Sequence, residues 1–468
     1  MVEVKLSYNP FEAKTTLEYK GKPEALSCFG DGKNSRLQEW LYDFFPDLKK
    51  KHNLGEGSEC KVSFYGTPGD FDDLGIAREA FLRDNPGIQL DLQHLNPESK
   101  QLASRLRDLK ALFERMQRES SYEELRDTKL KPRFERAVNS EFEISVIATM
   151  SSGKSTLINA ILGQEVLPAR NEATTAKIAR IRDVDGKADF TVRGFKRNGE
   201  ELVPVPPKVP ATPQVLEEMN DQEKSKDIAL IELEGNIPNI KSREMRLILS
   251  DTPGPNNSDD QEHAKHIDEL IKDDTYKPMI MYILNATQLE INDDKELLEK
   301  IATAMGKSGK QSKDRFLFVL NKADELDPGK KECVEKAIEN CKAYLKNNFE
   351  ICDARIFPAS AFLAKVIRKA RGKLRSEGKE PGYDLTENEE DFLPKIQRFV
   401  NTEKRHLSNF SDLSPSCKKQ QGVMLQDAIA KNDQAAQAEI YSGIPAIELA
   451  INEYLDKYAI TTKINQAI

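Results

Sequence analysis

The sequence predicts an α/β protein: a doubly wound domain with a small α+β domain before it and a short helical neck. Three observations predict this fold. From Glu141 to about Ala361, apolar segments of strand length alternate with amphipathic segments of helix length, as in a parallel sheet covered on both faces. Before them, short alternating strands and two helices fill residues 1–96. Two further apolar stripes at helical spacing, one on each side of the large domain, predict the neck.

Residues 1–96 are predicted to form the small α+β domain. Its predicted elements are two strands, a helix, a strand, a helix and a last strand, in the segments VEVKLSY, KTTLEYK, RLQEWLYDFF, CKVSFYG, the helix from Asp70, and IQLDLQHL. Asp70, Asp72 and Asp73 at the start of the second helix have two interpretations, as paired catalytic acids or as helix capping. We adopt capping, because the N-terminus of a helix favours carboxylates.

The neck is predicted from residues 97–140, with a helix that begins near Pro97, and from a closing helix in residues 443–468. Apolar residues recur at steps of four and three in both helices, at Leu102, Leu106, Leu109, Phe113 and Met116 in the first and at Ile447, Ile451, Tyr454 and Tyr458 in the second. We pair the two helices. The alternative is that each packs on the α/β domain, since periodicity does not name a partner.

The composition indicates a soluble, cytoplasmic protein. Charged residues make up 32% of the 468 residues, no apolar run reaches the ~18 residues that span a bilayer, and the N-terminus lacks the pattern of a secretory signal. Six cysteines form no CxxC pair and are too sparse for a disulfide framework. The net charge of −8 argues against direct nucleic-acid binding by the protein as a whole.

The segment from Ala148 to Gly163, ATMSSGKSTLINAILG, is predicted to bind phosphate. It lies between a strand, FEISVIA, and an amphipathic helix, as phosphate binding requires. Ala148 stands where the pattern has its first glycine, at the entry of the loop, and is tolerated there if its φ is negative. Lys154 would reach the β- and γ-phosphate oxygens, and Ser155 would ligate Mg²⁺. The loop residues predicted to contact the nucleotide are Ser151, Ser152, Gly153, Lys154, Ser155 and Thr156.

A second motif, MRLILSDTPGPNN, follows about a hundred residues later. Its strand ends in Asp251, which would hold Mg²⁺ through water, and Gly254 follows with an N–H that would meet a γ-phosphate. The carboxyl ends of parallel strands meet at one crevice in this fold. The two motifs therefore predict a single phosphate and Mg²⁺ site.

Two more motifs predict that the base is guanine. RFLFVLNKAD ends a strand in Asn321, Lys322 and Asp324. The carboxylate of Asp324 would accept two hydrogen bonds from guanine that adenine cannot offer. RIFPASA then places Ser360 and Ala361 where a backbone N–H would contact guanine O6. The sequence therefore predicts a site for GTP or GDP.

These motifs resemble those of the dynamin-like large GTPases, specifically their bacterial members of the CrfC and LeoA kind. The resemblance rests on SSGKSTLIN, LPARNEATTA, DTPGPNN, NKADELDPG and the closing SGIPAIELAINEYL, and it covers about Glu141 to Ile468. It implies a P-loop GTPase domain over residues 141–442, with an insert at about 185–244. It also implies GTP hydrolysis coupled to homodimerisation through the GTPase domains, with membrane remodelling as the commonest outcome.

The resemblance implies roles for residues in the switches. Thr175, or its neighbour Thr174, would ligate Mg²⁺ and bind the γ-phosphate. Asp327 would lie at the dimer interface, and its alternative interpretation is a residue of a solvated turn. Two residues depart from the pattern: Met150 and Pro255 stand where dynamins and small GTPases, respectively, carry a glutamine that orients the attacking water.

The predicted catalytic residues are Lys154, Ser151, Thr175 and Arg170. Ser151 would hold a water or a cation near the bridging oxygen. Arg170 would reach the γ-phosphate charge in its own site or in a neighbour's, and its alternative interpretation is a solvated loop arginine. A second functional hypothesis is a nucleotide-gated binding module that recruits a partner with little turnover.

Two other segments have competing interpretations. Ala364–Arg375, AKVIRKARGKLR, is predicted to form a basic amphipathic helix. This helix would either lie on anionic lipid or bind a partner. We favour the alternative, in which the helix docks on the α/β domain and its basic face is solvated. Gln89–Leu92, QLDL, resembles the short motif with which bacterial proteins dock on the replication sliding clamp. Gln93 replaces the expected aromatic residue, which favours an edge strand.

Overall fold

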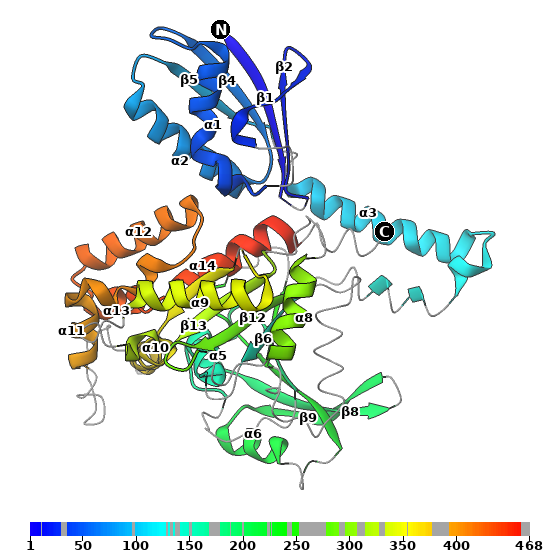
Figure 1. Cartoon of the computed structure of the whole chain (residues 1–468). Helices are drawn as coiled ribbons and strands as arrows, with labels where there is room; N and C mark the ends of the chain where they lie inside the picture. The colour runs from blue at the N-terminus through cyan, green and yellow to red at the C-terminus, as the bar shows by residue number, and fades with distance from the viewer. Residues whose placement is uncertain are drawn as a thin grey trace.

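The computed structural model describes residues 1–10, 12–29, 35–95, 99–127, 130–131, 134–135, 141–148, 152–167, 178–187, 189–198, 201–221, 225, 227–240, 246–251, 278–289, 295–306, 314–326, 333–352, 354–376 and 393–459. Within these ranges, a small N-terminal domain stands on a larger α/β domain whose sheet is flanked by helices (Figure 1). The predicted doubly wound α/β domain and the small α+β domain before it are confirmed.

The N-terminal domain contains every strand and helix that the sequence predicts. Its elements are β1 (Val2–Asn9), β2 (Lys14–Tyr19), β3 (Lys22–Glu24), η1 (Ser27–Phe29), α1 (Leu37–His52), β4 (Glu59–Tyr65), α2 (Pro68–Asp84) and β5 (Gln89–His94). They form a five-stranded sheet of order β3-β2-β1-β4-β5, in which β1 runs parallel to β4 and antiparallel to β2. Side chains along each strand point alternately into and out of the domain, and the inward ones pack with Trp40, Phe44 and Phe45 of α1 in one core.

The segment Gln89–Leu92 lies in β5, the outer strand of this sheet. The side chain of Leu90 is buried in the core of the domain. The edge-strand interpretation is therefore the one that the structure supports.

The large domain is built on a nine-stranded sheet of order β14-β13-β12-β6-β11-β7-β10-β8-β9. Its strands are β6 (Glu141–Ala148), β7 (Ile178–Asp183), β8 (Thr191–Asn198), β9 (Glu201–Pro210), β10 (Ile228–Gly235), β11 (Arg246–Asp251), β12 (Met279–Asn285), β13 (Phe316–Asn321) and β14 (Arg355–Ala359). The five strands from β14 to β11 are mutually parallel. Successive residues of a strand face opposite sides, so Val146 and Ile147 belong to different core clusters. The sheet is therefore covered on both faces.

The helices of this domain follow the strands along the chain. They are α5 (Lys154–Leu162), α6 (Pro213–Asn220), α8 (Lys295–Gly306), η3 (Ala323–Glu325), α9 (Val334–Phe349) and α10 (Ala361–Ser376). Thr212 caps α6 by accepting a hydrogen bond from the N–H of Val215, as its position before Pro213 predicts.

The insert predicted at 185–244 extends the sheet. It contributes β8, β9 and β10, which continue the sheet beyond β7. Its proline-rich stretch forms β9, which pairs with β8 and ends the sheet. An outer strand tolerates prolines because one of its edges needs no N–H donors.

The C-terminal segments are helical. They comprise α11 (Leu393–Asn401), η6 (Glu403–Arg405), η7 (Leu407–Phe410), α12 (Pro415–Ala430), α13 (Gln434–Tyr441), α14 (Ile444–Tyr454) and η8 (Leu455–Ala459). The predicted first neck helix is α3 (Ser99–Glu119), followed by η2 (Glu123–Arg126). In the view of Figure 1, α3 extends away from the large domain.

The predicted pairing of the closing helix with the helix near Pro97 is corrected. The stripe Ile447, Ile451, Tyr454 and Tyr458 is buried in the same core cluster as Phe142 of β6. The physical reason is visible in IPAIELAI, which is apolar on almost every side, and a helix apolar all round belongs inside a core. The boundary placed at residue 443 therefore does not separate two packing units.

The basic helix α10 is docked on the large domain, but its basic side chains are not simply solvated. Arg368 is 6% exposed and contacts Glu448 at 2.5 and 2.9 Å and Glu439 at 2.8 Å. Lys365 and Lys369 both pair with Glu165. These basic side chains are used within the domain, which opposes the lipid-binding interpretation.

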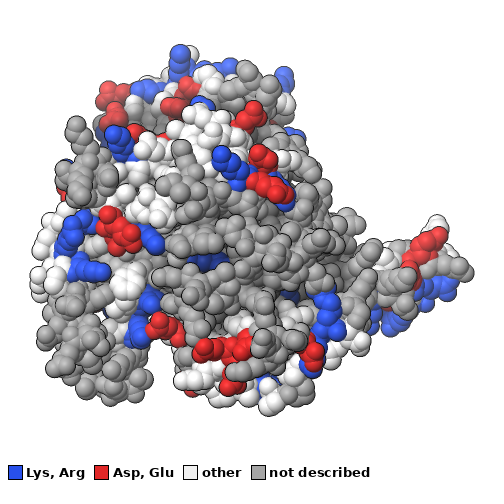
Figure 2. Space-filling model, turned by 60° about the horizontal axis from the view of Figure 1, so that its bottom comes forward, with Lys and Arg blue, Asp and Glu red and all other residues white. Residues whose placement is uncertain are grey.

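Charges of both signs are mixed on the face drawn in Figure 2, where Lys and Arg side chains stand beside Asp and Glu. No helix among the described residues is long and apolar enough to cross a membrane.

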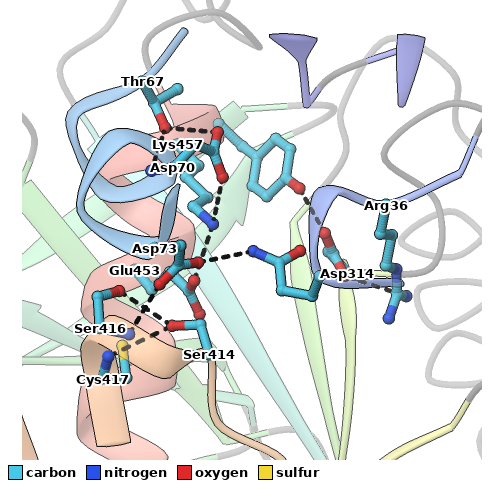
Figure 3. Close-up of polar contacts among 12 residues, drawn as sticks. Arg36, Thr67, Asp70, Asp73, Asp314, Ser414, Ser416, Cys417, Glu453 and Lys457 are labelled. Atoms are coloured by element: carbon cyan, nitrogen blue, oxygen red, sulfur yellow. Dashed lines mark hydrogen bonds and ion pairs between the residues drawn. The ribbon is translucent and has the colours of Figure 1, made fainter. Parts of the chain in front are cut away.

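The two domains meet at a buried group of charges, which we call the junction (Figure 3). Lys457 Nζ of η8 lies 2.8 Å from Asp70 Oδ1 of α2 and 2.8 Å from Glu453 Oε1 of α14. Asp73 Oδ1 accepts the Ser416 N–H at 2.7 Å. Burial alone would lower the pKa of Lys457. The charges of Asp70 and Glu453 nevertheless raise that pKa well above its ordinary value.

A second contact closes the junction. Arg36, at the start of α1, lies 3.0 Å from Asp314, which also accepts a hydrogen bond from the Tyr458 hydroxyl. The capping prediction for the α2 carboxylates is therefore only partly correct. Thr67 is the N-cap, and Asp70 accepts its hydroxyl at 2.6 Å while it also pairs with Lys457 across the domains.

Candidate nucleotide site

The predicted phosphate loop connects β6 to α5 at the carboxyl edge of the parallel strands. Gly153 immediately precedes α5 and has a φ of 88°, which favours glycine. A Cβ added at Gly153 would lie 2.6 Å from Asn321 Nδ2, so the backbone approach also requires glycine. Helix α5 begins with Lys154, Ser155 and Thr156. The first N–H groups of a helix have no acceptor within the helix itself, which is why a helix N-terminus can bind phosphate.

Lys154 and Asp251 lie at the ends of different elements and meet directly. Lys154 Nζ lies 2.9 Å from Asp251 Oδ1, and the Asp251 side chain is fully buried at the end of β11. Oδ2 of Asp251 accepts no hydrogen bond from any described residue. A buried carboxylate oxygen with spare acceptor capacity fits a hydrated Mg²⁺ ion. Lys154 and Asp251 thus supply the opposite charges that a phosphate and its metal would need.

Asn321 joins the phosphate loop to the predicted base loops. Its Nδ2 donates to the Ser152 carbonyl at 2.7 Å, and its Oδ1 accepts the Ala361 N–H at 3.1 Å. Asn321 is 2% exposed at the end of β13. It therefore ties three of the four predicted motifs together.

The base loops lie at the neighbouring strand ends. Lys322 has a φ of 60° and turns the chain into η3, which carries Asp324 with a half-buried side chain. Ser360 follows β14, and its N–H donates to the carbonyl of Ser442 at 2.8 Å. Asp324 therefore follows the carboxyl end of β13, at the same edge of the sheet as the start of the phosphate loop after β6.

Eight predicted residues lie outside the described ranges. They are Met150, Ser151, Arg170, Thr174, Thr175, Gly254, Pro255 and Asp327. Their roles in catalysis, metal binding and dimerisation stay predictions.

Sequence reasoning missed two residues that support the site. Asn159 is fully buried in α5; its Oδ1 accepts the N–H groups of Val166 and Leu167, and its Nδ2 donates to the Leu167 carbonyl. It fixes the chain as it leaves α5 toward the first switch, and its signal was a lone amide among apolar residues in LINAIL. Arg405 contacts the base loop, and no motif marked it.

One protein family matches the part of the chain that holds this site. The profile of the dynamin family matches residues 144–323, from β6 to η3. This part of the chain is similar to the dynamin family. The match spans the phosphate loop, Asp251 and the start of the base loop.

Two bacterial proteins are similar to this chain. The clamp-binding protein CrfC of Escherichia coli is 26% identical over 310 residues, which are 54% of this chain and 40% of CrfC. Dynamin-like protein 1 of Campylobacter jejuni is 25% identical over 279 residues, 53% of this chain and 36% of that protein. The alignments thus span about two fifths of the length of these curated relatives.

Solved structures of an oligomerised bacterial dynamin pair, described as sensing and tethering membranes, are also similar. One matches 73% of this chain and 51% of its own at a TM-score of 0.37 and 16% identity. A second has a TM-score of 0.34 at 17% identity, with 74% and 50% covered.

Proposed function

We propose that this dynamin-like chain is a Mg²⁺-dependent GTPase that hydrolyses GTP to GDP and phosphate. The observation that carries the proposal is the meeting of Lys154, Asp251 and Asn321 at the carboxyl ends of parallel strands, with Asp324 one turn further. The match of residues 144–323 to the dynamin family supports guanine-nucleotide binding.

The described residues divide the work of binding. The α5 N-terminus and Lys154 would neutralise the charge of the phosphates. The Asp324 carboxylate would select guanine by accepting hydrogen bonds from the N1 and N2 groups of the base. Ser155, Asp251 and Thr175 would hold Mg²⁺, which supplies charge neutralisation of the phosphates when bound. The Lys154 ammonium group would leave Asp251 Oδ1 for the phosphate oxygens as the nucleotide enters.

Catalysis would be completed by a second copy of the chain. Met150 and Pro255 cannot orient water with their side chains, so order must come from elsewhere. We propose that GTPase domains dimerise across their nucleotides, with Arg170, Thr175 and Asp327 at the contact. The protein would act in the cytoplasm, with peripheral attachment to a membrane or a membrane-associated partner.

The test is GTP turnover per molecule across protein concentration, with ATP in parallel. Turnover should rise with concentration until dimers saturate, and ATP should not be hydrolysed. Thr175→Ala should abolish the rise while GDP binding persists, and Ala148→Gly should behave as the parent. Specific activity that is flat across concentration favours the alternative, a slow nucleotide-gated module that recruits a partner. Sedimentation with liposomes of anionic lipid, with and without GTP, tests the membrane attachment.

A further inference from the structure

The two predicted base loops are held by residues far along the chain. Arg405, in the short turn η6, is 5% exposed, and its Nη1 donates to the main-chain carbonyl of Asp324 at 2.7 Å. The N–H of Arg405 itself donates to the Thr402 carbonyl at 2.8 Å, which fixes the turn. The residue predicted to select guanine is therefore held through its backbone by a buried cation.

The second base loop is held in a similar way. The Ser442 carbonyl accepts the Ser360 N–H, and Gly443 follows with a φ of 83°. A Cβ at Gly443 would lie 2.1 Å from the Pro358 carbonyl oxygen, so the chain at Gly443 lies directly against the strand that ends at this loop. Only glycine permits both the conformation and the approach.

One ring contact joins the two supports. The His406 ring stacks on Tyr441 with centroids 3.4 Å apart and planes 2° apart. His406 follows Arg405 and Tyr441 precedes Ser442 in the chain. Residues 402–406 and 441–443 thus form a single unit, which we call the base support, beneath both loops.

Guanine selection by Asp324 depends on position. Its two carboxylate oxygens must face two donors of the base at once, and a small displacement loses hydrogen bonds that the purine edge cannot replace. The loop that carries Asp324 is a single 3₁₀ turn, η3, without the hydrogen-bond ladder of a longer helix. A hydrogen bond from a charged donor is stronger than a neutral one, and burial strengthens it further.

We propose that Arg405 is a positioning residue for guanine recognition: it fixes Asp324 so that both carboxylate oxygens reach the base. This inference rests on the proposed function. Arg405 acts through Asp324 and touches no nucleotide, so its effect should appear in the choice between bases more than in phosphate binding.

The test compares GDP with IDP, whose hypoxanthine base lacks the 2-amino group. Guanine gives Asp324 two hydrogen bonds and hypoxanthine gives it one. Displacing Asp324 should therefore weaken GDP binding by about tenfold and IDP binding by about threefold or less, so that the GDP preference falls. The variants are Arg405→Met and the shorter Arg405→Gln, with affinities measured by calorimetry and folding checked by thermal unfolding. Arg405→Lys, which keeps a cationic donor, should recover most of the preference.

Lys404→Met is the matched control, because Lys404 is the exposed neighbour in the same turn, and it should bind both nucleotides as the parent does. A merely structural role for Arg405 predicts a lower melting temperature with an unchanged ratio of GDP to IDP affinity. That unchanged ratio, in whichever of the Met and Gln variants folds, overturns the inference. A parent that does not prefer GDP over ADP instead overturns the proposed function, and the role of Arg405 falls with it.

Discussion

The nucleotide site and the junction both bury charged side chains, but their charges are satisfied differently. In the junction, both carboxylate oxygens of Asp70 have partners, the Thr67 hydroxyl and the Lys457 ammonium group. In the nucleotide site, Lys154 contacts one oxygen of Asp251, and the other accepts no hydrogen bond from any described residue. In the junction, the carboxylate oxygens of Asp70 are paired within the protein. In the nucleotide site, Asp251 keeps one oxygen that can accept a hydrogen bond from a ligand or a metal-bound water.

The largest expected effect lies in the junction. Lys457→Met should lower the free energy of unfolding by about 3–5 kcal/mol, because it leaves Asp70 and Glu453 buried beside an apolar side chain. GDP affinity of the folded protein should stay as in the parent. Chemical denaturation and calorimetry measure the two quantities.

The control for the junction is Lys419→Met. Lys419 lies 3.8 Å from Glu79 with both side chains exposed, so the change should cost less than about 1 kcal/mol. Equal losses in the two lysine variants would contradict the account of the junction as a buried network.

A change at the phosphate loop should have the opposite profile. Lys154→Ala should weaken GTP binding by about a hundredfold, because it removes charged hydrogen bonds to phosphate. It should also lower the stability of the nucleotide-free protein by about 1–3 kcal/mol, since the buried Asp251 carboxylate loses its cation.

The double variant Lys154→Ala/Asp251→Asn separates the two effects. It removes the unpaired charge, so stability should recover while GTP affinity stays low. A Lys154→Ala protein that binds GTP like the parent would show that this loop is not the phosphate site.

Much of the fold followed from local pattern. The strands and helices of residues 1–96 were predictable because alternation and helical spacing are properties of a single segment. That Asp251 and Asn321 lie at the same edge of the sheet was predictable, because parallel strands bring their carboxyl ends together.

Contacts between distant segments were not predictable. The spacing of Ile447 and Ile451 predicted a buried helix face, but it did not predict that the α/β core covers this face. The position of Asp70 at a helix start was explained by capping alone, so nothing in the sequence indicated its ion pair with Lys457 of the other domain. Arg405 donates a hydrogen bond to the main-chain carbonyl of Asp324, and a main-chain acceptor leaves no mark in the sequence.

The central claim is that the end of β13 selects guanine, and the most direct test is the affinity of Asp324→Asn for GDP and for XDP. An asparagine amide donates where guanine also donates, whereas xanthine offers a carbonyl at that position. The parent should prefer GDP, and the variant should prefer XDP, with the ratio of the two affinities reversed by about a hundredfold or more. Lys457→Met, in the junction, should keep the preference of the parent. An Asp324→Asn protein that retains the GDP affinity of the parent would contradict the assignment.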